Sequence, residues 1–402
     1  MSNRRNIGIL FFTLVVVMMG FGMIIPILPF YVEQFNTGGS TLGLLMATYA
    51  LMQFIFAPVW GRLSDQHGRK PILMVGILGN AIASLLFGLS TQLWMLFAAR
   101  ALAGILSSAT LPTAMAYIGD STSEEDRGGG MGILGAAMGV GMVIGPGVGG
   151  WLAVKSLSLP FFLAAGLSMV ALLLVWWLLP ETLTLEEQAK ARATAVEGSF
   201  KTQFRDMWQA LSGPIAFLLV LAFLLSFGMT NFESVFGLYS LERFNYGPQQ
   251  VGGILMFVGV ISAVVQGGLT GVATRRWGEA AIIKASLLGS AIGFALMLLA
   301  FNMATVLLTV GFFVLSNSML RPAVSSLTSR RATGGQGIAM GLNNSFMSLG
   351  RIAGPVLAGF LFDVNIHFPY VIGALVMMLG FVLCGRYLET APTMETAVSA
   401  HS

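Results

Sequence analysis

The sequence predicts an all-α integral membrane protein with about twelve transmembrane helices in two pseudo-symmetric six-helix bundles. The chain of 402 residues is 56% hydrophobic and only 9% charged, whereas a soluble domain carries about 25% charged residues. Apolar runs recur along the chain that reach the length of about 20 residues needed to cross a bilayer. These runs fall into two sets of six, with a charged stretch between the sets.

The predicted spans, in chain order, are residues 7–30, 42–60, 71–90, 93–117, 130–153, 159–179, 214–240, 250–273, 281–300, 303–327, 337–362 and 367–388. The first run is not expected to be a removable signal peptide. It contains Pro26 and Pro29, lacks a small-residue cleavage site, and exceeds the apolar region of about 7–15 residues found in such peptides. Alternating segments typical of barrel strands do not occur in the sequence, so the spans are expected to be helices.

The distribution of Lys and Arg predicts the orientation. If both termini are cytoplasmic, the outer loops contain only Lys155 and Arg243. The inner segments then hold Arg4, Arg5, Arg62, Arg69, Lys70, Arg127, Lys190, Arg192, Lys201, Arg205, Arg275, Arg276, Lys284, Arg330, Arg331 and Arg386. This positive-inside pattern predicts a multi-pass protein of the cell membrane with both termini in the cytoplasm. The sequence pI of about 9.4 therefore reflects topology, and no nucleic-acid partner is expected.

The charged stretch at 181–206 divides the chain into two similar halves. We expect an N-terminal bundle at 1–180, a cytoplasmic linker at 181–212, and a C-terminal bundle with a short tail at 213–402. Three pairs of features recur at an offset of 209–210 residues: Leu111-Pro112 and Arg321-Pro322, Gly145-Pro146 and Gly354-Pro355, Gly61 with Gly68 and Gly271 with Gly278. A constant offset indicates a duplicated six-helix unit. Transporters built from two such halves bind substrate near the bilayer midplane between them.

Residues 61–71, GRLSDQHGRKP, connect the second and third spans. Gly61 allows two helices to approach closely, and Gly68 permits a tight turn. Asp65 is suited to pair with a basic residue or a helix N-terminus, and Arg69 and Lys70 supply basic groups nearby. The loop is interpreted as a latch that holds one conformation closed, and the alternative is a positively charged topology anchor.

The fifth span carries glycines at a spacing of four residues in GMVIGPGVGG. Gly141, Gly145 and Gly149 form a small-residue face for close helix packing, and Pro146 lacks a backbone donor and bends the helix. We interpret this segment as a hinge, with a packing face as the alternative. The same hinge role is assigned to Pro26, Gly354 and Pro355.

Together these segments resemble the major facilitator superfamily. The loop matches its signature pattern at Gly61, Leu63, Ser64, Asp65, Gly68, Arg69 and Lys70. Arg100 with Gly104, the Gly/Pro segment of the fifth span and GFGMIIPILP resemble the drug:proton antiporter branch with twelve spans. SFGMTNFESVFGLY, MLRPA and GLNNSFMSLGRIAGPVLAGFLFDV resemble the NorA/Bmr-type multidrug efflux pumps. The resemblance implies the major facilitator fold and a monomeric proton-coupled exporter of amphiphilic small molecules, such as antibiotics, that works by alternating access.

Four ionisable residues lie at membrane depth: Arg100, Glu233, Arg321 and Arg351. Such residues are functional candidates by default. A carboxylate that moves between an apolar environment and a nearby Arg takes up and releases a proton. Glu233 is therefore the predicted proton or substrate site, and a fixed ion pair is the alternative. Arg100 is expected to act in coupling, unless it only binds backbone carbonyls.

The substrate cavity is expected to include Arg321, Ser318 and Arg351, and a role in helix packing is the alternative for Arg321. Ser318 stands where NorA-like relatives place an Asp, and Arg351 stands where the family more often has a neutral residue. These departures favour neutral, zwitterionic or anionic amphiphiles over strongly cationic drugs. The 24 Met and 29 Phe suit a broad apolar cavity, since such side chains repack around varied ligands. Most of these residues face lipid or the core, and the preferred cavity candidates are Met46, Phe227, Phe232, Phe236 and Met319.

The sequence also argues against several other classes. Its single cysteine, Cys384, excludes an internal disulfide framework, and its three histidines show no metal-site spacing, so no metal or cofactor is expected. No nucleophile–base constellation or phosphate loop indicates an enzyme. Three alternatives remain: a proton-linked lipid or glycolipid flippase on the same fold, an exporter of one specific metabolite, or a membrane scaffold without transport.

Overall fold

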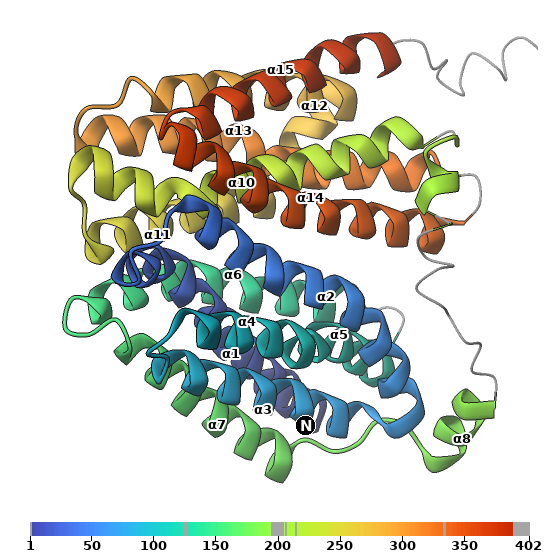
Figure 1. The fold of residues 1–402 in the computed structure, drawn as a ribbon. Coiled ribbons are helices and arrows are strands. Elements are labelled where there is room, and N and C mark those ends of the chain that lie inside the picture. Colours follow the sequence, from blue (N-terminus) through green and yellow to red (C-terminus); the bar gives the residue numbers. More distant parts are fainter. Residues whose placement is uncertain are drawn as a thin grey trace, which may run out of the picture. The chain divides into compact units, whose positions relative to one another are not determined.

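The computed structural model describes residues 2–123, 127–193, 205, 207–213, 215–332 and 335–388, and every regular element among them is a helix (Figure 1). The first half contains α1 (Ser2–Gln34), α2 (Gly39–His67), α3 (Arg69–Gly88), α4 (Leu93–Leu106), the 3₁₀ turn η1 (Ser107–Ala109), α5 (Thr110–Ser121), α6 (Arg127–Ala153), α7 (Leu159–Leu178) and the short α8 (Leu185–Ala193). The second half contains α10 (Ala216–Phe244), α11 (Pro248–Val264), the π-helical turn η2 (Val265–Leu269), α12 (Thr270–Met297), α13 (Met303–Arg330), α14 (Gln336–Val364) and α15 (Phe368–Leu388).

Eleven helical stretches of the described chain are long and apolar enough to cross a membrane. One of them, Pro248–Met297, has 50 residues and is therefore long enough for two spans. Gly278 interrupts it with φ 78° and ψ 156°, a left-handed conformation that glycine adopts without steric strain. The predicted architecture of about twelve helical spans is thereby confirmed.

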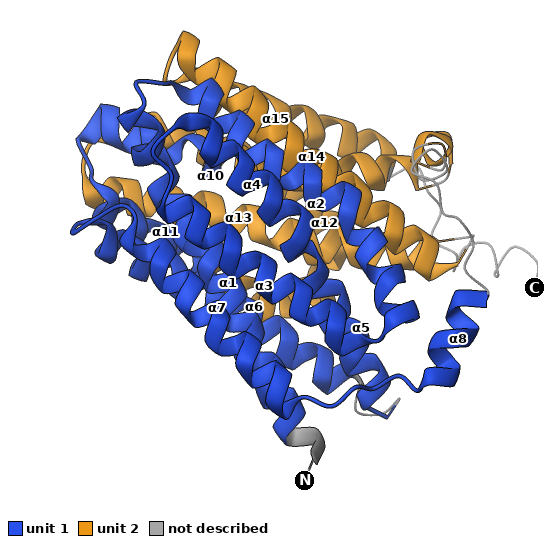
Figure 2. Cartoon of the chain, turned by 60° about the horizontal axis from the view of Figure 1, so that its bottom comes forward, with its two compact units in different colours: residues 1–200, 233–260 blue, residues 201–232, 261–402 orange. Residues whose placement is uncertain are grey.

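The contacts within the chain define two compact units (Figure 2). The first comprises residues 1–200 and 233–260, and the second comprises residues 201–232 and 261–402. Helix α10 thus contributes its first part to one unit and the part from Glu233 onwards to the other. Of the predicted linker, residues 194–204 and 206 lie outside the described residues.

In the first unit, α1 packs against α6 and α7, and α3 packs against α4 and α7. Small residues at these contacts let the helices approach closely, as is usual in membranes. A Cβ atom at Gly145 would lie 2.6 Å from the Met19 carbonyl oxygen and 3.0 Å from Gly22 Cα, both on α1. A Cβ atom at Gly149 would meet the Met23 backbone in the same way, 2.8 Å from its Cα. The glycine face predicted for the fifth span therefore packs against α1.

The second unit repeats this packing. A Cβ atom at Gly350 of α14 would lie 2.4 Å from the Phe223 carbonyl oxygen of α10, and one at Gly354 would lie 2.9 Å from that of Phe227. Gly350 and Gly354 follow Gly141 and Gly145 by 209 residues. The pair α14 and α10 thus corresponds to the pair α6 and α1, as expected for a duplicated unit.

The fourth span is broken by η1, which separates α4 from α5. Pro112 lies just beyond the break, and its ring clashes with the carbonyl four residues earlier in a regular α-helix. The carbonyl oxygen of Ile105, at the edge of the break, accepts hydrogen bonds from Trp60 Nε1 of α2 at 2.6 Å and from Ser108 Oγ at 2.8 Å. These bonds stabilise the 3₁₀ turn, because they satisfy a group that the interrupted helix leaves exposed.

Candidate functional site

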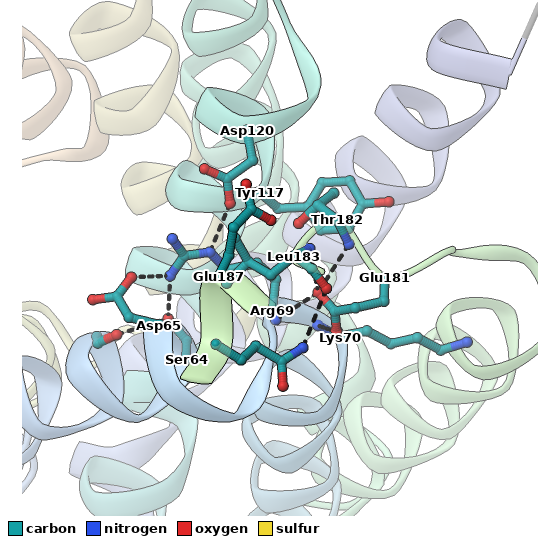
Figure 3. Close-up of polar contacts among 12 residues, drawn as sticks. Ser64, Asp65, Arg69, Lys70, Tyr117, Asp120, Glu181, Thr182, Leu183 and Glu187 are labelled. Carbon is teal, nitrogen blue, oxygen red and sulfur yellow. Dashed lines mark hydrogen bonds and ion pairs between the residues drawn. The ribbon is translucent and has the colours of Figure 1, made fainter. Parts of the chain in front are cut away.

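The predicted latch contains a three-residue charge cluster (Figure 3). Arg69, the first residue of α3, is almost fully buried and forms ion pairs with Asp65 on α2 and Asp120 on α5. Its Nε atom lies 2.8 Å from Asp120 Oδ2, and its Nη1 atom donates to Ser64 Oγ at 2.8 Å. The cluster therefore ties the ends of three helices together through one guanidinium group. Asp65 and Arg69 were expected to take part, and Asp120 was not.

A second carboxylate caps the start of α3. Glu181 accepts hydrogen bonds from the backbone N–H groups of Arg69 at 2.9 Å and Lys70 at 3.0 Å (Figure 3). The N–H groups of Thr182 and Leu183 donate to the same side chain. A negative charge at a helix N-terminus satisfies its free N–H groups and interacts favourably with the helix dipole. Glu181 thereby fixes the segment after α7 to the beginning of α3.

Gly68 forms the tight turn between α2 and α3, as expected. Its φ of 100° lies in a region that L side chains rarely adopt, and a Cβ atom there would lie 2.5 Å from Glu181 Oε2. Both the conformation and the available space therefore require glycine at this position. Lys70 turns away from the acids and donates from Nζ to the Trp176 carbonyl oxygen at 2.7 Å. Gly61 has no neighbour within 4 Å of a Cβ position.

Helix α8 extends this network. Thr184 and Glu187 form a reciprocal capping pair at its start, in which Glu187 Oε2 accepts from the Thr184 N–H at 2.8 Å. Hydrogen bonds from the backbone and the hydroxyl group of Thr184 lower the pKa of Glu187. At the other end of α8, Arg192 Nε donates to the Gln66 carbonyl oxygen at 2.7 Å. The segment from Glu181 to Arg192 therefore contacts both the end of α2 and the start of α3.

The second unit contains a related cluster with the charges exchanged. Glu279 follows the left-handed Gly278 and pairs with Arg330 at 3.2 Å, and Ser326 Oγ donates to it at 3.1 Å. Positions 278, 279 and 330 follow positions 68, 69 and 120 by 210 residues. The basic residue at the start of α3 is thus replaced by an acid, and the acid at the end of α5 is replaced by Arg330.

The two clusters give a matched prediction. Arg69→Met should lower the free energy of unfolding by about 1–3 kcal/mol, because it leaves two carboxylates without their shared cation. Arg330→Met should have an effect below about 1 kcal/mol, because the Arg330 side chain is 71% exposed. Thermal unfolding of both variants in detergent tests this. Equal losses of stability would contradict a special role for Arg69.

Arg100 lies in α4 and is only 2% exposed. Its guanidinium carbon lies 5.5 Å from the ring centre of Tyr49 and 5.8 Å from that of Phe87, so two aromatic faces flank the charge. Its Nε atom is buried without a hydrogen-bond partner among the described residues. Among the described residues this guanidinium group meets aromatic rings, and its role in coupling stays a prediction.

Glu233 lies in α10 and is half-buried between the buried residues Phe232 and Ser234. Within its compact unit, no hydrogen bond or ion pair joins the carboxylate to another described side chain. A carboxylate at membrane depth is unfavourable when it has no partner. The fixed ion pair that was the alternative for Glu233 is therefore not seen in this part of the chain, and its role as the proton or substrate site stays a prediction.

The polar candidates on α13 and α14 have separate surroundings. Ser318 is buried, and its Oγ atom lies 3.0 Å from Ser262 Oγ, near the end of α11. Arg351 is exposed, and its Nη2 atom donates to Ser348 Oγ at 2.9 Å. Arg321 is also exposed and lies one turn after Ser318. At position 318, where the resemblance led us to expect an acid, the chain therefore has a hydroxyl pair.

The apolar candidates divide into packed and partly exposed residues. Phe227 stacks on Phe223 with ring centres 5.9 Å apart, and Phe232 lies 5.3 Å from Phe313. Both are buried, as is Phe236, whereas Met46 and Met319 are half-buried. The phenylalanines thus take part in helix packing, and the assignment of all five residues to a substrate cavity stays a prediction.

Asp120, Glu181 and Ser262 were not predicted from the sequence. Asp120 and Glu181 lie at the ends of predicted spans beside the α2–α3 loop, and that common location was the available signal. Their pairing joins residues 51 and 112 positions apart, so no local pattern could show it. Ser262 carries no charge and stands among apolar residues, so nothing in the sequence distinguished it from a packing residue.

Comparison with known proteins places these features in context. The family model of the Major Facilitator Superfamily matches residues 10–335 and 269–401. The chain is 33% identical to multidrug resistance protein 2 of Bacillus subtilis (strain 168) over 376 residues, 93% of each chain. It is also 33% identical to multidrug resistance protein 1 of the same strain, over 94% of this chain and 96% of the relative. Identity to the quinolone resistance protein NorA of Staphylococcus aureus (strain COL) is 29%, over 94% and 96%.

Solved structures show the same fold at lower identity. The human organic anion transporter MFSD10 (TETRAN) superposes with a TM-score of 0.70 and 23% identity, over 95% of this chain and 99% of that one. The nucleoside transporter NupG superposes with a TM-score of 0.80 and 13% identity, over 96% and 100%. Similarity at this level of identity concerns the fold alone.

Proposed function

Because this chain belongs to the major facilitator superfamily, we propose that it is a proton-coupled exporter of amphiphilic drugs or related small molecules. The observation that carries the proposal is similarity to multidrug resistance proteins over nearly the whole chain. The chain is a transporter and not an enzyme. It acts as a monomer by alternating access, with both termini in the cytoplasm and the α2–α3 loop on the cytoplasmic side.

The residues have distinct roles in this proposal. Glu233 binds the proton. This role is supported by the lack of an ion-pair partner for Glu233 among the described residues of its compact unit. Arg100 is assigned to coupling, because it places a charge at membrane depth in α4, where ionisable residues are functional candidates. The cluster of Asp65, Arg69 and Asp120 holds the ends of α2, α3 and α5 together during part of the cycle.

The same proposal assigns the substrate. With Ser318 paired to Ser262, and with the exposed Arg321 on α13 and the exposed Arg351 on α14, the chain offers more basic than acidic groups to a ligand. We therefore favour neutral, zwitterionic or anionic amphiphiles over strongly cationic ones.

A pH-gradient dissipation screen tests the function. Purified protein in proteoliposomes with an internal pH dye should release a preformed proton gradient when a transported amphiphile is added. Cationic, neutral and anionic amphiphiles of similar size should be compared, with empty liposomes as the control. A response to several unrelated compounds supports multidrug export, a response to one compound indicates a specific metabolite exporter, and no response to any compound contradicts proton coupling.

A lipid or glycolipid flippase is the second candidate, because the exposed Arg351 on α14 could bind an anionic headgroup. Fluorescent anionic lipid placed in one leaflet should then become inaccessible to an added quencher in a protein-dependent manner. Movement of labelled lipid without drug-induced proton flux would select this function over drug export.

A further inference from the structure

The broken fourth span carries buried hydroxyl groups that form no hydrogen bond with another described residue. Buried Ser and Thr in membrane helices usually donate to a carbonyl of their own helix. Ser290 and Thr328 do so here, at 2.7 Å to Ser286 and 2.8 Å to Val324. By contrast, the hydroxyl oxygens of Ser107, Thr110 and Thr113 are buried and have no hydrogen-bond partner among the described residues.

These hydroxyl groups are aligned by the 3₁₀ turn. In a 3₁₀ helix, with about three residues per turn, residues i and i+3 eclipse each other, so Ser107 and Thr110 lie one above the other across η1. In an α-helix of about 3.6 residues per turn, residues seven apart also share a face. Arg100 therefore lies on the same face as Ser107, and Thr113 and Tyr117 continue the row beyond Thr110.

The two ends of this row are chemically distinct. At one end lies the guanidinium group of Arg100, whose Nε atom is buried and unpartnered like the hydroxyls. At the other end, Tyr117 is fully buried and its hydroxyl donates to the Pro180 carbonyl oxygen at 2.9 Å. Pro180 precedes Glu181 of the α3 cap, and Asp120 of the charge cluster lies three residues after Tyr117. The row thus leads from a membrane-embedded charge to the charged loop end of the bundle.

Ideal helix geometry gives this row a spacing close to the span of one bridging water molecule. Neighbouring hydroxyls on one face are separated along the axis by about 6 Å across the 3₁₀ turn and about 4.5 Å across the α-helical turn. One water molecule donating to one oxygen and accepting from another spans about 5.5 Å, given O–H···O distances of about 2.7–2.8 Å. Buried polar groups that lack a protein partner are generally satisfied by such water. On α1, which contacts α5, the buried Thr13 hydroxyl is unpartnered too and offers a further polar group.

We propose that Ser107, Thr110 and Thr113 bind a file of buried water molecules, and that this file carries protons between the Arg100 region and the cytoplasmic end of the first unit. The water hydrates the Arg100 charge, for which the described part of the chain supplies the aromatic rings of Tyr49 and Phe87. Each transfer breaks one O–H bond in a donor water as one forms on its neighbour, so the file moves a proton without net change. The proton route rests on the proposed function, whereas the water file itself does not.

X-ray radiolytic labelling tests the water file directly, because bound water generates hydroxyl radicals in place. In the parent protein, Tyr117 should be oxidised at a rate close to that of the exposed Tyr387, although Tyr117 is 0% exposed. Phe313, which is equally buried within an aromatic cluster, is the dry control. The combined variant Ser107→Ala, Thr110→Val, Thr113→Val should lower Tyr117 oxidation by about fivefold or more. Oxidation of parental Tyr117 as slow as that of Phe313 would overturn the proposal.

Proton flux tests the route. With a transported amphiphile, the combined variant should move protons about tenfold more slowly than the parent at saturating substrate, with an unchanged substrate Kd. Thr328→Val is the matched control, because it removes a buried hydroxyl that its own helix satisfies. The double variant Thr110→Ser, Thr113→Ser keeps both hydroxyl groups and should therefore move protons at the parental rate. It can also be measured if the combined variant fails to fold.

The outcomes separate this inference from the proposed function. If the combined variant moves protons at the parental rate, the proposed proton route is wrong, whereas the proposal of drug export still stands. A parent without any substrate-linked proton flux would disprove the proposed function, and rapid labelling of Tyr117 would then still support the water file.

Discussion

Replacing Glu233 with Gln should abolish transport that is driven by a pH gradient, with a loss of about 100-fold or more. The amide has nearly the same shape as the carboxyl group but cannot bind and release a proton at neutral pH. Removing a half-buried charge that has no partner in its described unit should leave the fold intact. Substrate-dependent proton flux and substrate uptake in proteoliposomes measure the effect, and thermal unfolding verifies the fold.

Glu33→Gln is the matched control for this change. Glu33 is an exposed acid at the end of α1, so its neutralisation should leave transport unchanged. The proton-site assignment fails if Glu233→Gln transports at the parental rate. It also fails if both variants lose transport equally, because the cause would then be overall charge.

Gly145→Val should prevent the first unit from folding. The Cβ atom would lie 2.6 Å from the Met19 carbonyl oxygen and 3.0 Å from Gly22 Cα, so the clash is with backbone that cannot turn away. Overpacking typically destabilises by about 1–3 kcal/mol even where side chains can move, and here two helices must separate. We expect the variant to be lost from the membrane fraction or to elute as aggregate in size-exclusion chromatography.

Gly139→Ala provides the comparison on the same helix. No atom lies within 4 Å of a Cβ position at Gly139. The substitution should be neutral or should stabilise α6 by up to about 1 kcal/mol, since alanine favours the helix over glycine. A folded Gly145→Val protein would show that α6 and α1 can separate without loss of structure.

The helical spans were predictable because membranes impose a simple requirement on length and polarity. The glycine face of α6 was predictable too, since its spacing matches the helix period and places Gly141, Gly145 and Gly149 on one side. The 3₁₀ break was not predicted, although Pro112 was recognised within a repeated motif. The carbonyl group of Ile105 at the break accepts a hydrogen bond from Trp60, which lies 45 residues away in the sequence.

The candidate site was predictable only in part. Ionisable residues are rare within apolar membrane spans, so Arg100 and Glu233 could be selected from sequence. Their neighbours could not, because the rings of Tyr49 and Phe87 come from two other helices. Ser318 could be selected from sequence, but its hydroxyl pair with Ser262 depends on the register between α11 and α13.

The cap that Glu181 places on α3 has a consequence for dividing this protein into two polypeptides. A cut after residue 180, at the end of the sixth span, would remove the carboxylate that holds the N-terminus of α3 and the Arg192 contact to Gln66. A cut after residue 193 would leave both with the first fragment. Co-expressed halves should therefore reassemble more efficiently when the chain is cut after residue 193. The reason is that residues 181–193 form hydrogen bonds with α2 and α3, which are in the first fragment.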